Sequence, residues 1–568
     1  MTTSDLHAAT PASSKLGAVT IPAALVALPF LFPFASGPSV NAWQQLAAFA
    51  CAALLLSQAP AMPQQRVLGL LAVIGLSILL GQGSVSPPGI YAVAAVSMVA
   101  ATACAGAALA RAPLSQQGAL AWGVFIAGFL SAILGLLQYY GFAASLAPWV
   151  NAPALGQAYG NLRQRNQFAT LISMALVAAL WLYASGGRHV RGAAIPAAAL
   201  LVLALAASTS RTGLVQLLLI SGSSAWLAWR ERVPAPGREG PASARLPPPW
   251  ALLALIPAYF AAAWLLPLLA ASGVEGMMHR LREGAPADHS RIALWSNVLE
   301  LIARHPWAGW GWGELAFAHY SASYRGLRFT EILDNAHSLP LHLAVELGIP
   351  AAVLICGGFG WLVWTARPWR ETDPARLMAW GLLGAILLHS LLEYPLWYGP
   401  FQLVFGLCLG FLWPSSPEKA AGVPEDGPLF MRSLALILAL MASVGYAAWD
   451  YTRISQLYLG REDRLPAWRD DTLAKAQGSW LFANQVQFAE LALTQVRQDN
   501  AAEVHAMAQR LLHFSPEPRV VIKLIDSAML LGRDAEAFAQ AERFRIAFPR
   551  EYARWLAEHP VDDELPSE

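Results

Sequence analysis

The sequence predicts an all-α protein, a polytopic transmembrane helical bundle followed by a separate helical domain. Three observations predict this fold class. The chain is 56% hydrophobic and only 13% charged, whereas soluble domains carry about a quarter charged residues. Apolar runs close to bilayer length recur between residues 21 and 450. From Asp450 onward, the composition becomes that of a soluble domain.

About thirteen apolar runs make up the membrane part, which we assign to residues 21–450. A span needs about 20 apolar residues, so we expect the shorter runs to be tilted. The runs are 21–36, 42–58, 67–82, 89–110, 118–141, 168–185, 192–208, 212–229, 250–270, 340–364, 377–396, 400–413 and 432–449. Residues 1–20 are a predicted cytoplasmic tail. The first run could be a signal peptide, but its prolines and the prompt second run favour a retained helix.

Lysines and arginines in the short loops predict the orientation, because cytoplasmic loops are enriched in them. The loops 36–41 and 83–88 carry no positive charge, whereas the alternate loops carry many. The basic residues of those alternate loops are Arg66, Arg111, Arg188, Arg191, Arg230, Arg232, Arg238, Arg245, Arg367, Arg370, Arg376, Lys419 and Arg432. This pattern predicts a multi-pass protein surrounded by membrane lipid, with the C-terminus outside. In a Gram-negative-type cell the membrane would be the bacterial inner membrane, and the C-terminus would lie in the periplasm.

Two polar regions then lie outside the membrane. The loop at 271–339 is long enough to build a site between two spans. The domain at 451–568 shows helical periodicity in 470–497, 501–514, 518–531 and 534–546. Residues 515–549 resemble one tetratricopeptide-type helix pair. A small helical domain resting on the membrane part is the alternative.

Composition argues against several classes of function. The net charge is +1, and no Lys/Arg-rich run with interleaved aromatic residues indicates a nucleic-acid partner. The four cysteines lie in apolar runs without metal-ligand spacing, so we predict neither disulfides nor a metal site. A secondary transporter is disfavoured, because the sequence shows no inverted-repeat pattern of broken helices.

His337 is the first candidate for chemistry, because it precedes a predicted helix start. Ser338 is the predicted N-cap and Pro340 lies in the first turn. The positive end of the helix dipole disfavours imidazolium and favours the neutral form that a general base needs. A capping or interfacial histidine is the alternative. The pair His342 and Glu346 lies on another helix face, so we expect it to serve packing.

Arginines on the outer side are the second candidate group. Arg163 and Arg165 violate the charge rule for outer loops, and Arg211 lies at a span boundary. Arg291 follows Ser290 in the large loop. Guanidinium groups suit phosphate and diphosphate, so these arginines could hold an anionic ligand. The alternative is ordinary ion pairing, for example of Arg291 with Asp288 or Glu275.

A third group is predicted inside a span, where ionisable residues usually mark function. His389 and Glu393 are four residues apart and would share a helix face, with Tyr394 beside them. Two ligands without a third make a metal site a poor interpretation. A hydrogen-bonded pair that joins two helices is the alternative.

Several short motifs together resemble a known group of membrane enzymes. Asn335-Ala336-His337, Leu347-Gly348-Ile349, the glycine-rich turn Trp307–Gly313, Ser290-Arg291 and Ser210-Arg211 resemble the O-antigen ligase and polymerase superfamily. Gly160-Asn161, the run Gln164–Gln167 and the run His389–Tyr398 resemble the bacterial protein O-oligosaccharyltransferases of that superfamily. The resemblance covers residues 160–560, and the order of the motifs is its most specific feature.

The resemblance implies transfer of a preassembled oligosaccharide from undecaprenyl pyrophosphate, by inversion and without a cofactor. The implied acceptor is a Ser or Thr hydroxyl of a pilin or another periplasmic protein. An O-antigen ligase or polymerase, acting on lipid A core or another glycan, is the alternative. The implied base is His337, and the implied diphosphate ligands are Arg165, Arg211 and Arg291. The implied substrate-binding residues are Gln164, Asn166, Asn335, His389, Glu393 and Tyr394.

Overall fold

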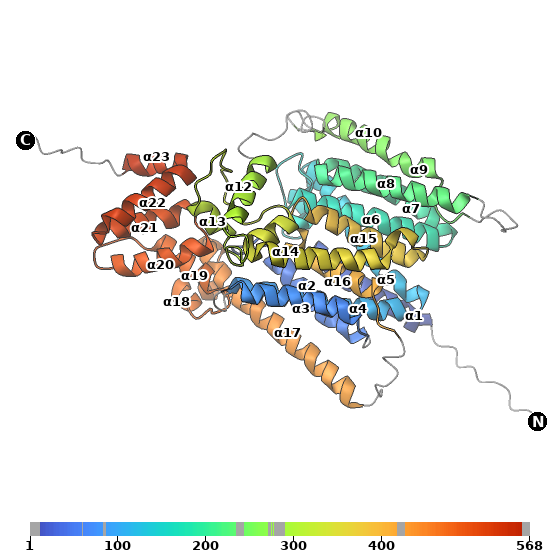
Figure 1. The fold of residues 1–568 in the computed structure, drawn as a ribbon. Helices are drawn as coiled ribbons and strands as arrows, with labels where there is room; N and C mark the ends of the chain where they lie inside the picture. The colour runs from blue at the N-terminus through green and yellow to red at the C-terminus, as the bar shows by residue number, and fades with distance from the viewer. Residues whose placement is uncertain are drawn as a thin grey trace, which may run out of the picture.

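The chain forms a long bundle of helices with a smaller helical domain at one end, as seen in the computed structural model (Figure 1). The structure describes residues 12–58, 61–82, 87–233, 244–270, 274, 276–277, 290–416 and 427–558. Their regular elements are all helical, apart from one isolated bridge between Pro63 and Pro414. The predicted all-α class is therefore confirmed for these residues.

Each predicted apolar run coincides with a helix or with a pair of consecutive helices. The helices are α1 (Ala12–Leu31), α2 (Ala42–Leu55), α3 (Gln65–Leu80), α4 (Pro87–Arg111), α5 (Leu114–Tyr139), α6 (Arg165–Ser185), α7 (Arg188–Ala207), α8 (Arg211–Arg232), α9 (Pro249–Leu253), α10 (Leu255–Leu268), α14 (Leu339–Ala366), α15 (Pro374–Ser390), α16 (Gly399–Leu412) and α17 (Gly427–Ser455). Among the described residues, eight helices are long and apolar enough to cross a membrane, and four shorter apolar helices accompany them. The count of thirteen spans stays a prediction.

Small residues set the closest helix contacts in the bundle. A side chain at Gly410 would place its Cβ 1.7 Å from the carbonyl oxygen of Ala103, and one at Gly106 would meet the carbonyl of Leu407 at 2.1 Å. Helices α4 and α16 therefore touch backbone to backbone, as is common where helices associate in a membrane.

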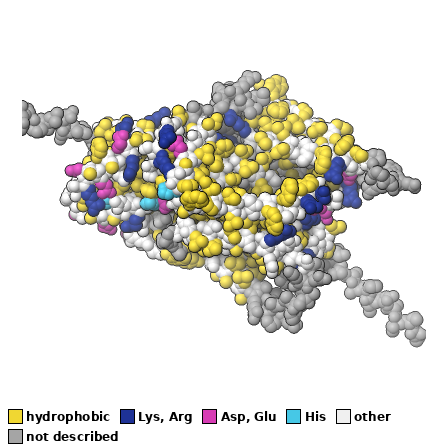
Figure 2. Space-filling model, in the orientation of Figure 1, with side chains coloured by type: hydrophobic (Ala, Val, Ile, Leu, Met, Phe, Trp, Pro, Cys, Tyr) yellow, Lys and Arg dark blue, Asp and Glu magenta, His cyan; other side chains and the backbone are white. Residues whose placement is uncertain are grey.

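Basic side chains gather at the end of the bundle away from the C-terminal domain (Figure 2). There Arg66 donates to Thr365 near the end of α14, at 3.3 Å, and Arg376 donates to the carbonyl of Leu412, at 3.0 Å. His337 lies at the opposite end of α14, a segment of 28 residues. The placement fits the charge pattern used to predict the orientation, which remains a prediction.

The C-terminal domain is built from consecutive short helices. They are α18 (Thr472–Ala476), α19 (Ala483–Leu493), α20 (Ala501–Phe514), α21 (Pro518–Leu530), α22 (Asp534–Ala547) and α23 (Pro549–Glu558). The prediction of one helix over 470–497 is wrong. A turn divides it, because the buried Ser479 hydroxyl accepts from the amide of Phe482 and donates to Asp450 at the end of α17. The tetratricopeptide assignment stays a prediction.

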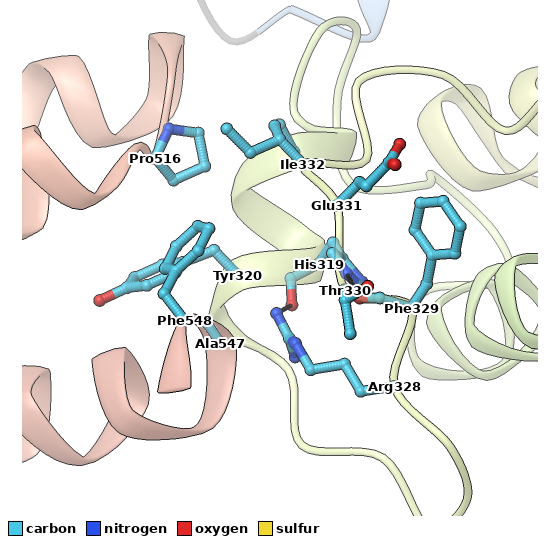
Figure 3. Close-up of a pocket in the computed structure, with 11 residues that line it drawn as sticks. His319, Tyr320, Arg328, Phe329, Thr330, Glu331, Ile332, Pro516, Ala547 and Phe548 are labelled. Atoms are coloured by element: carbon cyan, nitrogen blue, oxygen red, sulfur yellow. Dashed lines mark hydrogen bonds between the residues drawn. The ribbon is translucent and has the colours of Figure 1, made fainter. Parts of the chain in front are cut away.

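The loop 271–339 between α10 and α14, which we call the outer loop after its predicted side, is partly helical. It contributes to the core of the C-terminal domain. It contains α12 (Arg291–Arg304) and α13 (Leu315–Ser321). Tyr320 of α13 is buried among residues of the C-terminal domain, donates to Gln540 and stacks on Phe548. Figure 3 shows this side chain beside Phe548 and Pro516. The loop and the domain are therefore joined by an apolar contact.

Helix α1 begins at Ala12, within the range 1–20 that we assign to a cytoplasmic tail. The assignment of this tail stays a prediction.

Candidate active site at four helix N-termini

Three capped helices begin with the arginines that the sequence singled out. Arg165 opens α6, Arg211 opens α8 and Arg291 opens α12. Each follows a residue whose side chain accepts a backbone amide of the first turn. The cap bonds are Gln164 to Gln167 at 2.6 Å, Ser210 to Gly213 at 3.0 Å and Ser290 to Ala293 at 3.2 Å. Gln164, predicted to bind substrate, thus uses its side-chain oxygen as a helix cap.

Hydrogen bonds between side chains bring these helix starts together. The hydroxyl of Ser210 donates to the Oδ1 atom of Asn166 at 2.6 Å, which sets the first turns of α6 and α8 side by side. The Nδ2 atom of Asn166 donates to Oε1 of Glu393 at 3.2 Å, and Arg291 of α12 donates to the same oxygen. Helix N-termini carry partial positive charge, so their convergence favours an anion.

His337 forms the centre of the site with Glu393. The Nδ1 atom of His337 lies 3.0 Å from Oε2 of Glu393. The Glu393 side chain is 6% exposed, whereas that of His337 is 27% exposed. A carboxylate beside Nδ1 holds the proton on that nitrogen and leaves the lone pair on Nε2. The arrangement is suited to a general base that reaches a substrate.

Glu393 is held in its ionised form. Burial by itself raises the pKa of this carboxyl, but the hydrogen bond to His337 and the charges of His337 and Arg291 outweigh that effect. The pKa therefore lies below its ordinary value. The carboxylate is then available to stabilise an imidazolium when His337 accepts a proton.

The backbone around His337 is held in an uncommon conformation. His337 has a φ of 49°, in the left-handed region that costs free energy for a residue with a Cβ. Its amide donates to Oδ1 of Asn335 at 2.9 Å, and the indole of Trp295 donates to the carbonyl of Ala336 at 3.1 Å. The amide of Ala336 donates to Nδ1 of His342, at 3.5 Å. These contacts fix the direction of the imidazole.

Helix α14 begins after Ser338 as predicted, but Ser338 does not cap it with its side chain. Ser338 has a φ of −161°, and its hydroxyl makes no cap hydrogen bond. Only its carbonyl takes part, accepting from the amide of His342 at 2.8 Å. The pair His342 and Glu346 is buried, with 3.3 Å between Nε2 and Oε2, and thus serves packing as predicted.

The glycine-rich turn that precedes α13 packs on a break in α14. Gly348 has a φ of 85°, which interrupts the helix and frees carbonyl groups. The amides of Trp310 and Gly311 donate to the carbonyls of Val345 and Glu346, at 2.9 and 3.0 Å. A Cβ on Gly309 would lie 2.3 Å from the carbonyl oxygen of Glu346. The turn therefore fixes the outer loop to α14.

The prediction for His389, Glu393 and Tyr394 is wrong about the helix. Helix α15 ends at Ser390, so Glu393 and Tyr394 lie in the following turn. Pro395 accounts for this, because the residue before a proline is disfavoured in helical conformation. Tyr394 packs its ring edge-on against His337, with centroids 5.1 Å apart, and burial raises the pKa of its phenol. The phenol is therefore neutral.

His389 lies deeper than the site. Its side chain is fully buried, and its Nδ1 atom lies 2.8 Å from the hydroxyl of Thr170. Gln216 donates to the same hydroxyl at 3.0 Å. Direct contact with a substrate, as predicted for His389, does not fit this burial. Thr170 and Gln216 were not predicted, although both are polar residues in apolar helices.

The predicted arginines differ in their surroundings. Arg163 is not an anion ligand, because its guanidinium donates to the backbone carbonyls of Pro33, Val40 and Asn161. Arg211 is exposed and Arg165 is half-buried, each beside a residue of the hydrogen-bonded cluster. Arg291 pairs with Glu393. Its suggested partners Asp288 and Glu275 lie outside the described residues.

No group of three His, Cys, Asp or Glu side chains in the described part of the chain is placed to hold a metal ion.

Comparisons with known proteins show similarity to a group of membrane enzymes. A family model described as "O-Antigen ligase" matches residues 196–356. One described as "Protein glycosylation ligase" matches residues 158–183, and one described as "Virulence factor membrane-bound polymerase, C-terminal" matches residues 377–560. The matched segments contain Arg165, Arg211, Arg291, His337 and Glu393.

A general O-oligosaccharyltransferase of Acinetobacter baylyi is 24% identical over 348 residues. The alignment covers 59% of this chain and 57% of that relative, so the chain spans little more than half the length of the curated protein that it matches. The apolar helices and these matches indicate that the present chain is a multi-pass membrane protein. The chain is thus similar to the O-antigen ligases and membrane-bound polymerases, and among them it resembles the protein glycosylation ligases and a general O-oligosaccharyltransferase.

Proposed function

We propose that this protein is an inverting glycosyltransferase of the bacterial inner membrane. It moves a preassembled oligosaccharide from undecaprenyl pyrophosphate to Ser or Thr hydroxyls of periplasmic proteins such as pilins. The observation that carries the proposal is the pair of His337 and Glu393 at converging helix N-termini, with Arg291 on the same carboxylate. The similarity to a general O-oligosaccharyltransferase supports a protein acceptor.

The first chemical task is to activate the acceptor hydroxyl. His337 takes the hydroxyl proton on Nε2 while the oxygen attacks the anomeric carbon. Glu393 stabilises the resulting imidazolium through Nδ1, 3.0 Å away. One displacement forms the new bond to the anomeric carbon and breaks the bond to the diphosphate oxygen, so the anomeric configuration inverts.

The second task is to hold the diphosphate, which leaves with the bonding electron pair. The first turns of α6, α8 and α12 offer backbone amides and the positive ends of their dipoles. Arg165 and Arg211 extend from two of these turns, and Arg291 from the third. Arginine forks match phosphate oxygens in geometry and charge. The developing charge is thus met by groups that need no rearrangement.

The third task is to bring a protein acceptor to His337. The C-terminal domain receives Tyr320 of the outer loop in its own core, and the same loop ends at His337. A protein docked on this domain would therefore be held by the segment that carries the base. An O-antigen ligase or polymerase would use the same base and donor with a glycan acceptor.

A reconstitution experiment tests the proposal. The purified protein in liposomes is supplied with an undecaprenyl-pyrophosphate-linked oligosaccharide and a purified pilin, and peptides are examined by mass spectrometry. We expect the intact oligosaccharide on Ser or Thr. His189→Ala is the matched control for His337→Ala, because His189 is an exposed histidine at the start of α7. Transfer to lipid A core and not to pilin would support the ligase alternative.

A further inference from the structure

Asn166 lies between two helix starts and the candidate catalytic carboxylate. Its Oδ1 atom accepts from the hydroxyl of Ser210 at 2.6 Å, and its Nδ2 atom donates to Oε1 of Glu393 at 3.2 Å. Ser210 is buried and Glu393 is 5% exposed. Both ends of the Asn166 amide therefore have protein partners, which is an unusual use of a residue predicted to bind substrate.

The hydroxyl of Ser210 decides which way this amide points. An Asn amide has one accepting end and one donating end. Since the Ser210 hydroxyl donates to one end, the NH2 end is turned toward Glu393. Ser210 also accepts from the amide of Gly213 at 3.0 Å, so its own position is fixed by the start of α8. The orientation of Asn166 is thereby tied to two helices.

The carboxylate of Glu393 is divided between its two oxygens. Oε1 receives Asn166 and Arg291, and Oε2 faces Nδ1 of His337. Two donors on Oε1 leave Oε2 for the imidazole. Without Asn166, Arg291 alone holds Oε1, and the carboxylate turns more freely about its terminal torsion, since this torsion is broad and two-fold. Its bond to His337 then loses direction.

We propose that Asn166 and Ser210 are positioning residues that orient Glu393, and through Glu393 the proton on His337. This inference rests on the proposed function and deepens it, because it assigns Asn166 to the base rather than to the substrate. The other titratable groups near Glu393 are Arg291 and His389, with Asp334, Tyr394 and Tyr398 beyond them.

The test uses the full-length protein in liposomes, with the lipid-linked donor and a pilin, across pH 5 to 9. For Asn166→Ala we expect kcat to fall by about a hundredfold, while KM for the donor stays within about twofold. The acid side of the pH–rate profile should move to lower pH, because a loosely held carboxylate stabilises the imidazolium less. Ser210→Ala should change the profile in the same direction, and Ser210→Thr should restore it.

Three results would overturn the proposal. A raised KM for the donor with an unmoved pH profile would make Asn166 a substrate ligand. Reduced thermal stability and kcat with an unmoved profile would make it a structural residue. An effect of Asn166→Ala that Ser210→Ala does not share would remove Ser210 from the pathway. Ser223→Ala is the matched control, because Ser223 is an exposed residue of α8 that bonds only its own helix.

The same assay separates this inference from the proposed function. If the unmodified protein transfers no oligosaccharide to pilin, the proposed function fails. If it transfers and Asn166→Ala matches it in kcat and pH profile, only the positioning role fails.

Discussion

Two layers of polar side chains lie about one helical turn apart at the same end of the bundle, and they differ in charge and exposure. The outer layer contains Arg291, His337 and Glu393 with Asn166 and Ser210. The inner layer contains Thr170, Gln216 and His389, all buried. Helix α6 contributes to both layers, and so do the segments around the start of α8 and the end of α15.

The difference between the layers indicates which one carries out the reaction and which one aligns the helix ends. The outer layer holds an ionised carboxylate, an arginine of opposite charge and an imidazole with an exposed edge. The inner layer is closed: Thr170 bonds His389 and Gln216, and Gln216 also donates to the carbonyl of Ala385. A reacting base needs access to substrate, so the chemistry belongs to the outer layer, and the inner layer holds the helix ends in place.

The largest expected effect is that of His337→Ala. Loss of the base should lower the rate of transfer by about a thousandfold, as general-base catalysis contributes factors of about 10² to 10⁴. Glycosylated pilin is quantified by mass spectrometry at equal protein levels. His342→Ala is an informative comparison, because His342 supports the same loop without reaching its surface. Near-normal transfer by His337→Ala would exclude the general base.

Arg291→Ala should have the second-largest effect. It removes the charge beside Glu393 and one guanidinium from the predicted diphosphate site. We expect kcat/KM for the lipid-linked donor to fall by about a hundredfold, or about 2.7 kcal/mol. Arg291→Lys should recover only part of this, since a lysine lacks the fork geometry. A full recovery by lysine would show that charge alone is needed.

The inner layer should matter less for the rate. Thr170→Val keeps the shape of the side chain but removes its bonds to His389 and Gln216. We expect less than a tenfold loss of kcat, together with a loss of stability of about 1 kcal/mol. Thermal unfolding in detergent and the transfer rate measure the two effects. A thousandfold loss of kcat without a stability change would place the inner layer in the chemistry.

The smallest expected effect concerns the junction between the outer loop and the C-terminal domain. Nδ1 of His513 lies 2.8 Å from Glu314, and this hydrogen bond raises the pKa of His513. Because the pKa of His513 is raised in the folded state, its hydrogen bond with Glu314 stabilises the fold fully below pH 6.5. This stabilisation is lost as the pH rises through the raised pKa. His513→Gln should therefore lower the melting temperature at pH 5.5 and leave it unchanged at pH 8.5. A loss independent of pH would contradict the ion pair.

The sequence predicts the helices and the individual site residues, but it does not predict which site residues contact one another. The apolar runs are long, so their helices follow from composition. His337 and Glu393 are 56 residues apart, and their contact depends on the fold. Arg163 shows the same limit, since only the structure reveals that its guanidinium donates hydrogen bonds to backbone carbonyls. The end of α15 was predictable, because Pro395 marks it.

The most direct test of the account compares the unmodified protein with Glu393→Gln in single-turnover transfer from pH 5 to 9. The account predicts that the unmodified rate falls at acid pH, since a general base must be unprotonated to accept the hydroxyl proton. In Glu393→Gln the imidazolium loses its carboxylate, so the plateau should fall about a hundredfold and the acid side should move to lower pH. An unchanged plateau and an unchanged profile would contradict the claim that His337 and Glu393 act together as the base.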